Sequence, residues 1–283
     1  MPPRTSPTYR QARLGAELRK MRLRAGVTAE FAAGLIGLDR GKIPNIESGV
    51  RTLSPERLRV LAANYGCTDE AYVEALVAMA QPRTRGWWDQ YRGKLSAGLL
   101  DIAELEWHAR RLHTVQTVHI PGLLQTEDYA RAIFGAVLPA LPRLEVELRV
   151  ALRQERRCVL QRAHPVPYTG FVHETALLMQ FGGRQAARDQ LKYLAEQSTA
   201  DHIAIRVLPI AEGIFPGAGH ALLYAEGPVP QLDTAQLDSA HGPGFMDGEN
   251  QLSKYRSHLE WMEAKALTPS ASRDFIHRIH KDL

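Results

Sequence analysis

The sequence has little cysteine and no long apolar run. Its two cysteines, Cys67 and Cys158, lie far apart and form no Cys-x-x-Cys pair, so they predict neither a disulfide framework nor a zinc site. No segment approaches the roughly 18 consecutive apolar residues of a membrane helix, and residues 1–4 do not open an apolar secretion signal. These absences favour a protein of the reducing cytoplasm with no membrane partner.

Motifs of catalysis and cofactor binding are also absent from the sequence. There is no Gly-x-Ser-x-Gly nucleophile elbow, no Gly-x-x-x-x-Gly-Lys phosphate loop and no Gly-x-Gly-x-x-Gly dinucleotide motif. The eleven histidines all lie after Trp107, but His173-Glu174 lacks a second histidine at zincin spacing, and His277 and His280 lack a neighbouring ligand cluster. We therefore expect no catalytic residue, no cofactor and no metal.

The composition is that of a folded protein with an uneven charge. Of the 283 residues, 45% are apolar and 23% are charged, as in globular domains, and the length favours two compact units. Residues 1–65 hold 12 Lys or Arg against 5 Asp or Glu, a net charge of +7, whereas the remaining 218 residues hold 23 against 26. A basic head gains affinity for polyanions by releasing counterions, so nucleic acid is the favoured ligand, with a solvated basic face as the alternative.

Apolar spacing and capping residues predict five short helices in residues 1–81. Apolar residues recur every three or four positions over residues 9–25, with basic residues between them, and predict a basic amphipathic helix that ends at Gly26. Thr28 then caps a second helix that ends at Gly37. The buried side of this second helix is expected to hold Phe31, Ala32 and Leu35.

Asp39 is the predicted cap of a third helix that runs to about Ser48. A fourth helix opens at Ser54-Pro55, and residues 69–80 supply the fifth. Short helices around a tight glycine turn favour a helix-turn-helix, whose recognition helix enters the major groove of DNA. On the third helix, Ile43, Ile46 and Glu47 are expected inside, and Arg40, Gly41, Pro44 and Asn45 outside.

Several of these residues form a known pattern: Gly-Val-Thr at 26–28, Phe31-Ala32, Leu35-Ile36-Gly37, Ile43, and Ile46-Glu47-Ser48-Gly49 followed by Arg51. Over residues 14–66 this pattern resembles the Xre and lambda-repressor-like helix-turn-helix family. The resemblance implies a five-helix DNA-binding domain in which Glu47 pairs with a nearby arginine to stabilise the fold. The chain departs from the family at Ala29, where glutamine is usual, and at Pro44, where serine is common and where proline removes an amide donor. A generic helical adaptor is the alternative.

Side-chain chemistry divides the predicted DNA contacts into two groups. Arg40 and Asn45 are expected at base edges, because guanidinium pairs with guanine and carboxamide with adenine. Lys42 and Arg51 are expected at phosphates, and the helix start at Thr28 is expected to donate backbone amides to another phosphate. For each residue, a solvated polar side chain is the alternative.

Residues 82–98 are expected to form a basic and aromatic linker that includes Trp87, Trp88 and Tyr91. Such an aromatic cluster usually packs one domain onto the next, with ligand stacking as the alternative. Residues 99–283 are expected to form an α+β domain with a small sheet, so that the whole chain is mainly α with a smaller α+β part. The expected helices are 99–107, 126–133, 144–161, 183–197, 250–265 and 269–280, and the expected extended segments are 112–120, 168–173, 202–208, 220–225 and 229–237.

The helix predicted over residues 144–161 carries a row of arginines. Its apolar residues share one side, and the arginines are expected on the opposite side, where a run of charge is usually a solvated face. The apolar residues are Leu148, Leu152 and Val159, and the exposed arginines are Arg149, Arg153, Arg156 and Arg157.

The C-terminal region contains a second pattern: RGWWDQY from residue 86, PGLLQTEDYARAI over 121–133, VALRQER over 150–156, FVHETAL over 171–177 and IRVLP over 205–209. In this order the segments resemble a large actinobacterial family of regulators that join an Xre-type module to a C-terminal domain of poorly defined role. The resemblance extends to about Leu267. It implies a cytoplasmic transcription regulator, often encoded beside a small partner protein in a pair likened to toxin and antitoxin.

We therefore expect a sequence-specific transcription regulator that binds double-stranded DNA as a homodimer. Its C-terminal domain is expected to provide dimerisation and to bind a small-molecule effector or a partner protein. Two alternatives stay open. One is an antitoxin-like interaction module with weak DNA reading, which Ala29 and Pro44 favour. The other is an enzyme with a DNA-binding head, which requires a convergent polar pocket that the sequence does not reveal.

Overall fold

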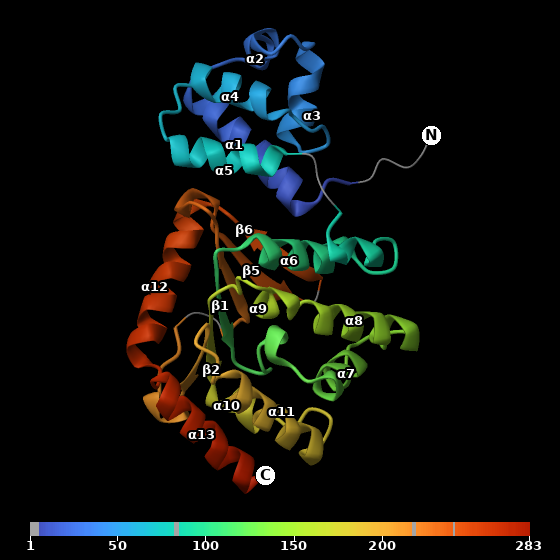
Figure 1. Cartoon of the computed structure of the whole chain (residues 1–283), viewed down its shortest axis with the longest axis vertical. Helices are drawn as coiled ribbons and strands as arrows, with labels where there is room; N and C mark the ends of the chain where they lie inside the picture. Colours follow the sequence, from blue (N-terminus) through green and yellow to red (C-terminus); the bar gives the residue numbers. More distant parts are fainter. Residues whose placement is uncertain (1–5, 82–84, 217–218, 240) are drawn as a thin grey trace. The chain divides into compact units, whose positions relative to one another are not determined.

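The computed structural model describes residues 6–81, 85–216, 219–239 and 241–283 of the chain (Figure 1). These residues divide into two units, Met1–Trp87 and Trp88–Leu283. Residues 82–84 of the expected linker lie outside the described residues. Trp88 and Tyr91, also assigned to that linker, are buried and belong to the second unit. The ring centroid of Trp88 lies 6.1 Å from that of Trp107, so this part of the aromatic cluster packs within the C-terminal unit.

The described part of the N-terminal unit consists of five α-helices and one 3₁₀-helix, which confirms the expected helical fold. Side chains of Thr8, Thr28, Ser54 and Asp69 accept hydrogen bonds from backbone N–H groups at the starts of four of these helices, since those groups have no partner within the helix. The elements are α1 Tyr9–Arg24, α2 Ala29–Leu35, η1 Arg40–Lys42, α3 Ile43–Glu47, α4 Pro55–Asn64 and α5 Glu70–Ala80.

A buried carboxylate links α1 to α5. Glu17 accepts hydrogen bonds from Arg13 Nε at 2.7 Å, from Lys20 Nζ at 2.8 Å and from Tyr72 Oη at 2.7 Å. Burial and the hydrogen bond to Glu17 raise the pKa of Tyr72, so its phenol stays a proton donor. Because a buried charge is tolerated only when it is paired and hydrogen-bonded, this cluster fixes the pairing of the two helices.

The expected buried side of α2 is wrong at Phe31, whereas Ala32 is buried as expected and Leu35 is partly buried. Phe31 is 58% exposed, and the buried residues of this helix are Ala32 and Ala33, followed by Ile36 at its C-cap. The segment is apolar at nearly every position, so its sequence does not specify which face is inside.

The expected third helix is wrong at its start. A 3₁₀ turn over Arg40–Lys42 precedes α3, which spans only Ile43–Glu47, and Asp39 makes no capping hydrogen bond. The Asp39 carboxylate instead lies 2.8 Å from Lys42 Nζ, whose hydrogen bond lowers the pKa of Asp39. Pro44 lies in the first turn of α3, where a missing N–H removes no helical hydrogen bond. The helix therefore begins late and is not broken at its proline.

Two glycines allow α3 to contact the backbone of α1. A Cβ atom on Gly15 would lie 2.5 Å from the carbonyl oxygen of Glu47, and a Cβ atom on Gly49 would lie 2.6 Å from the backbone nitrogen of Ala12. Gly49 also has a φ angle of +76°, which side-chain-bearing residues rarely adopt. The position of α3 is therefore set by a backbone contact with α1.

A six-stranded mixed sheet forms the centre of the C-terminal unit. Its order is β3-β2-β1-β4-β5-β6, with β1, β2 and β3 parallel and the other three pairings antiparallel. The expected α+β class is confirmed, although β6 falls in a segment for which the sequence pattern predicts no strand. The strands are β1 Arg111–Gln116, β2 Tyr168–His173, β3 Ile203–Leu208, β4 Leu222–Glu226, β5 Thr234–Ser239 and β6 Gly242–Met246.

Helices cover both faces of this sheet (Figure 1). On one face α12 packs over a core that includes Val115 and Phe171, and on the other face a larger core around Leu112 and Ile205 contacts α13 and several other helices. The helices are α6 Ala97–His108, α7 Glu127–Gly135, α8 Arg143–Glu155, α9 Cys158–Gln161, α10 Glu174–Leu178, α11 Arg184–Gln197, α12 Glu249–Lys265 and α13 Pro269–Asp282, with 3₁₀ turns η2 Trp87–Tyr91, η3 Gly122–Leu124, η4 Ile210–Glu212 and η5 Pro230–Leu232.

The single helix expected over residues 144–161 is two helices, and its arginines are not a solvated face. The chain leaves α8 at Arg156 and enters α9 at Cys158. Arg156 is 8% exposed, and Arg149, Arg153 and Arg157 are partly buried. Arg149, Arg153 and Arg156 recur at helical spacing, so they share one side of α8, and all three line a cavity.

Candidate functional site

The predicted DNA-contact residues lie on and around η1 and α3. The backbone N–H of Arg51 donates to the carbonyl oxygen of Asn45 at 2.9 Å, which folds the segment after α3 back onto that helix. Asn45 and Arg51 consequently line one surface concavity together with Val50 and Thr52. The structure thus brings one residue expected at a base edge next to one expected at a phosphate.

The remaining predicted contacts are exposed or weakly held. Arg40 Nη1 lies 3.8 Å from Glu30 Oε2, and the two side chains are 75% and 76% exposed, so this ion pair contributes little and Arg40 can leave it for another acceptor. Lys42 pairs with Asp39. Asn45 Nδ2 donates to the carbonyl oxygen of Gly41 at 3.3 Å, which leaves the carboxamide oxygen without a hydrogen bond to any described residue. The DNA contacts of these residues stay predictions.

Two further residues of this region have structural roles. The Thr28 hydroxyl accepts a hydrogen bond from the N–H of Phe31 at 3.2 Å and so caps α2. Glu47 accepts from Arg22 Nε at 2.5 Å and from Arg22 Nη2 at 2.9 Å, which confirms its predicted role in the fold. This hydrogen-bonded pair raises the pKa of Arg22. It joins α1 to the end of α3 and holds the candidate interface in place.

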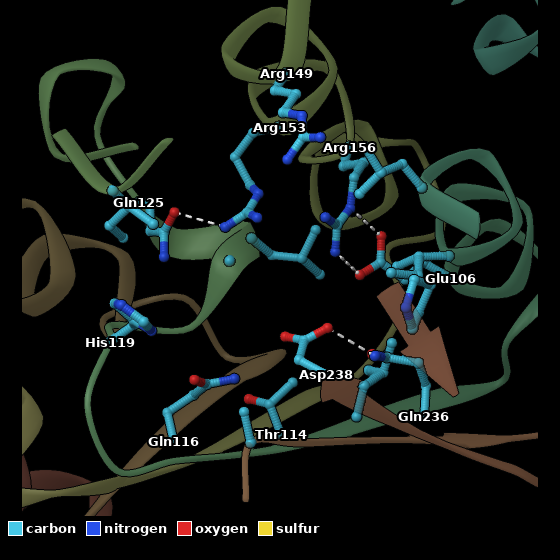
Figure 2. A pocket seen from close by; sticks show the side chains of 18 of the residues that line it. Glu106, Thr114, Gln116, His119, Gln125, Arg149, Arg153, Arg156, Gln236 and Asp238 are labelled. Atoms are coloured by element: carbon cyan, nitrogen blue, oxygen red, sulfur yellow. Dashed lines mark hydrogen bonds and ion pairs between the residues drawn. The ribbon is translucent and has the colours of Figure 1, made fainter. Parts of the chain in front are cut away.

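The C-terminal unit contains a polar cavity of about 270 Å³ (Figure 2). Side chains of β1, β4 and β5 form one wall, and residues of α6, α7, α8 and η3 form the others. Side chains alternate between the two faces of a strand, so Thr114 and Gln116 of β1 face the cavity, while Val115 enters the core beneath α12. The cavity therefore takes the place of apolar packing over this part of the sheet.

Two arginines of α8 and Arg156 at its C-cap line this cavity, and two of the three have carboxylate partners. Arg156 donates to both carboxylate oxygens of Glu106, at 2.8 and 2.5 Å, and the two side chains are 10% and 2% exposed. Arg149 Nη2 lies 2.6 Å from Glu145, its neighbour one turn earlier. Arg153 has no carboxylate partner among the described residues, and its Nη1 donates to Gln125 Oε1 at 2.6 Å. Burial and the nearby Arg156 lower the pKa of Arg153 to about 9.

The opposite side of the cavity is polar as well. Gln236 Nε2 donates to Asp238 Oδ1 at 2.8 Å, and the Thr114 hydroxyl lies 2.5 Å from that of Tyr168. His119 also lines the cavity, and burial, with a smaller effect of Arg153, lowers its pKa. The cavity thus contains an imidazole whose neutral form is favoured, three guanidinium groups and the carboxyl groups of Glu106 and Asp238, together with amide and hydroxyl groups.

Comparisons with protein families match both units of the chain. A family model for a helix-turn-helix domain matches residues 13–76, which indicates that DNA is a partner. A second model, described as domain of unknown function DUF5753, matches residues 99–278, more than half of the chain. The chain belongs to the DUF5753 family. Searches of the curated proteins and of the solved structures each returned no match.

The cavity lies within the matched DUF5753 domain, from Leu99 to Pro243. The sequence pattern gives none of its residues as a site. One signal was available: Arg149, Arg153 and Arg156 share a helix side, which can be a solvated stripe or a polar wall. The positions of Glu106 and Asp238 in the fold show that the arginines form a polar wall. These two acidic residues come from α6 and β5, which are distant from α8 in sequence.

The described part of this DUF5753 protein contains neither a membrane-spanning helix nor a metal-binding cluster. Over residues 6–81, 85–216, 219–239 and 241–283, no helix has the length and apolar character needed to span a bilayer. The same described residues include no group of three or more His, Cys, Asp or Glu side chains placed to hold a metal ion.

Proposed function

We propose that this DUF5753 protein is a sequence-specific, DNA-binding transcription regulator whose third helix reads bases. The helix-turn-helix match over residues 13–76 carries this proposal. The exposure of Arg40, Asn45 and Arg51 around α3 supports it, because a recognition helix needs polar side chains that reach beyond the protein surface.

Within this proposal, Arg40 and Asn45 contact base edges, and Lys42, Arg51 and the amides beside Thr28 contact phosphates. Arg40 and Asn45 are exposed, and each keeps hydrogen-bonding groups available for a base edge. Lys42 carries a compact ammonium group without the planar fork of arginine, so it acts as a point charge at the rim and not as a bidentate reader.

The base-reading assignment predicts different results for two kinds of substitution. We expect Arg40→Ala and Asn45→Ala each to reduce the preference for operator over random DNA by about 1–3 kcal/mol. We expect Lys42→Ala to weaken binding to both DNAs alike and to reduce the slope of log affinity against log salt by about one. Fluorescence anisotropy with an operator identified by a genome-wide map of bound sites measures both quantities.

A matched control removes a positive charge elsewhere in the N-terminal unit. Arg59 on α4 is exposed and makes a two-point ion pair with Glu74 on α5, so Arg59→Ala should leave the preference for the operator unchanged. If Arg40→Ala, Asn45→Ala and Lys42→Ala all changed specific and random binding equally, the assignment of base readers would be wrong.

We further propose that the protein binds as a homodimer paired through the DUF5753 domain, which also receives an effector or a small partner protein. Two recognition helices about 34 Å apart read successive major grooves, and one small module rarely provides enough affinity. Sedimentation of the full chain with and without operator DNA tests this. The Xre-type and actinobacterial affiliations also stay predictions.

A second candidate function is an antitoxin-like interaction module with weak DNA reading. Two observations favour it: α3 is only five residues long, and Ala29 offers no polar side chain at the start of α2. Binding to the chain's own promoter with the same affinity and salt dependence as to random DNA would support this candidate over the first.

A further inference from the structure

One arginine in the cavity of the DUF5753 domain forms no ion pair with any residue that the structure describes. Of the three arginines that line it, Arg149 and Arg156 pair with Glu145 and Glu106, whereas no carboxylate of a described residue lies within ion-pair distance of Arg153. Its guanidinium stacks on the ring of Phe134, with Cζ 4.9 Å from the centroid. A partly buried cation without a counter-ion is costly, so an anionic ligand group at this position would be stabilised.

The hydrogen bonds of Arg153 show which kind of anion fits. Nη1 donates to Gln125, and among the described residues the Nε and Nη2 donors have no acceptor. These two N–H groups form one edge of the guanidinium, and that edge matches the two oxygens of a carboxylate. The arginine is also oriented by its neighbours, because Nη1 donates to Gln125 and the guanidinium lies over the ring of Phe134. The free edge of Arg153 is therefore positioned before any ligand binds.

An anion faces this cation across the cavity. Figure 2 shows the Asp238 carboxylate on the opposite side of the space from Arg153. Asp238 Oδ1 accepts from Gln236, and no cation of a described residue lies within ion-pair distance of the carboxylate. The cavity thus offers a guanidinium on one side and a carboxylate on the other, and neither forms an ion pair with a residue that the structure describes.

We infer that this cavity binds a small organic zwitterion, with its carboxylate on Arg153 and its ammonium group on Asp238. A volume of about 270 Å³ is at the small end of ligand sites, so it suits a molecule of amino-acid size. Ile102, Leu123 and Phe134 provide apolar walls for a hydrocarbon chain between the two charged groups. The zwitterion is the effector of the regulator; that role rests on the proposed function, whereas the binding does not.

Calorimetric titration of the full chain with linear ω-amino acids, from glycine to 8-aminooctanoate, tests whether both charged groups of the ligand are bound. We expect affinity to pass through a maximum at one chain length. The alkyl carboxylate of that length without the amine should bind about tenfold more weakly, because it loses the contact with Asp238. Arg153→Gln should lower the affinity for the best ω-amino acid by about 10- to 100-fold. Asp238→Asn should make the ω-amino acid bind no more tightly than the alkyl carboxylate of the same length.

Arg143→Gln is the matched control, because Arg143 is an exposed arginine of the same helix outside the cavity lining. It should leave the affinity unchanged. Circular dichroism of each variant shows whether the fold is retained, and Arg153→Lys, which keeps the charge without the bidentate edge, serves if the glutamine variant does not fold. The inference is overturned if no probe binds the native chain at millimolar concentration, if binding survives both Arg153 substitutions, or if the carboxylate and the ω-amino acid bind equally.

A separate measurement distinguishes this inference from the proposed function. Operator affinity of the full chain is measured with and without the best ω-amino acid. An affinity change of tenfold or more that is lost in Arg153→Gln supports the effector role. Zwitterion binding to a chain that does not prefer operator DNA would overturn the proposed function but not the binding site. Preference for operator DNA without zwitterion binding would overturn the binding site but not the proposed function.

Discussion

Replacing Glu106 with glutamine should destabilise the C-terminal unit by about 3–5 kcal/mol. Glu106 is 2% exposed and is the carboxylate partner of Arg156, which is itself buried. The substitution leaves a buried guanidinium without its counter-ion, and that cost exceeds the loss of an ordinary hydrogen bond. Denaturant unfolding followed by tryptophan fluorescence measures the effect in this unit, because Trp88, Trp107 and Trp261 belong to it.

Two variants define the cause of that loss. Glu145→Gln breaks the more exposed pair between Glu145 and Arg149 on the same helix, and it should cost no more than about 0.5 kcal/mol. The double variant Glu106→Leu/Arg156→Met removes both buried charges and should recover most of the lost stability. A Glu106→Gln variant as stable as Glu145→Gln would show that the guanidinium is not desolvated as the structure places it.

Replacing Gly15 with alanine should lower the stability of the N-terminal unit by about 3 kcal/mol and weaken operator binding as well. The new methyl group would lie 2.5 Å from the Glu47 carbonyl oxygen, and this neighbour is backbone that cannot rotate away. The helix α3 must therefore move away from α1. Three of the four tryptophans belong to the C-terminal unit and only Trp87 to the N-terminal one, so the loss appears as a far-ultraviolet circular dichroism transition with little change in tryptophan fluorescence.

Gly34→Ala is the matched control in a neighbouring helix. A Cβ atom there meets nothing within 4 Å, and alanine has the higher helix propensity, so this variant should gain about 0.5–1 kcal/mol. The two glycine-to-alanine substitutions are thus expected to have opposite signs. Equal effects would show that helix propensity, and not the contact between α1 and α3, determines both.

Local sequence signals predict the N-terminal unit well. Caps such as Thr28 and Ser54 act within three residues, so four of the five helix starts follow from the sequence alone. The third helix fails because its start depends on two competing local choices. Asp39 pairs with Lys42 in place of capping, and Pro44 favours a first helical turn, so the helix begins at Ile43.

Long-range packing decides what the sequence pattern does not. The solvated face assigned to Arg149, Arg153 and Arg156 is consistent with helix periodicity, which shows that two sides differ without showing which side faces the protein. Glu106 is 50 residues before Arg156, and Asp238 belongs to β5, which β4 separates from β1 in the sheet. The cavity therefore requires the order of the strands, which neither composition nor spacing contains.

In helix α6, a residue of the cavity wall is directly followed by a residue of the aromatic cluster. Glu106 belongs to the wall of the cavity, and the next side chain, Trp107, packs against Trp88 at the beginning of the C-terminal unit. Because Glu106 and Trp107 are consecutive residues of one helix, the same rigid element forms part of the cavity wall and holds Trp88, the first residue of the C-terminal unit.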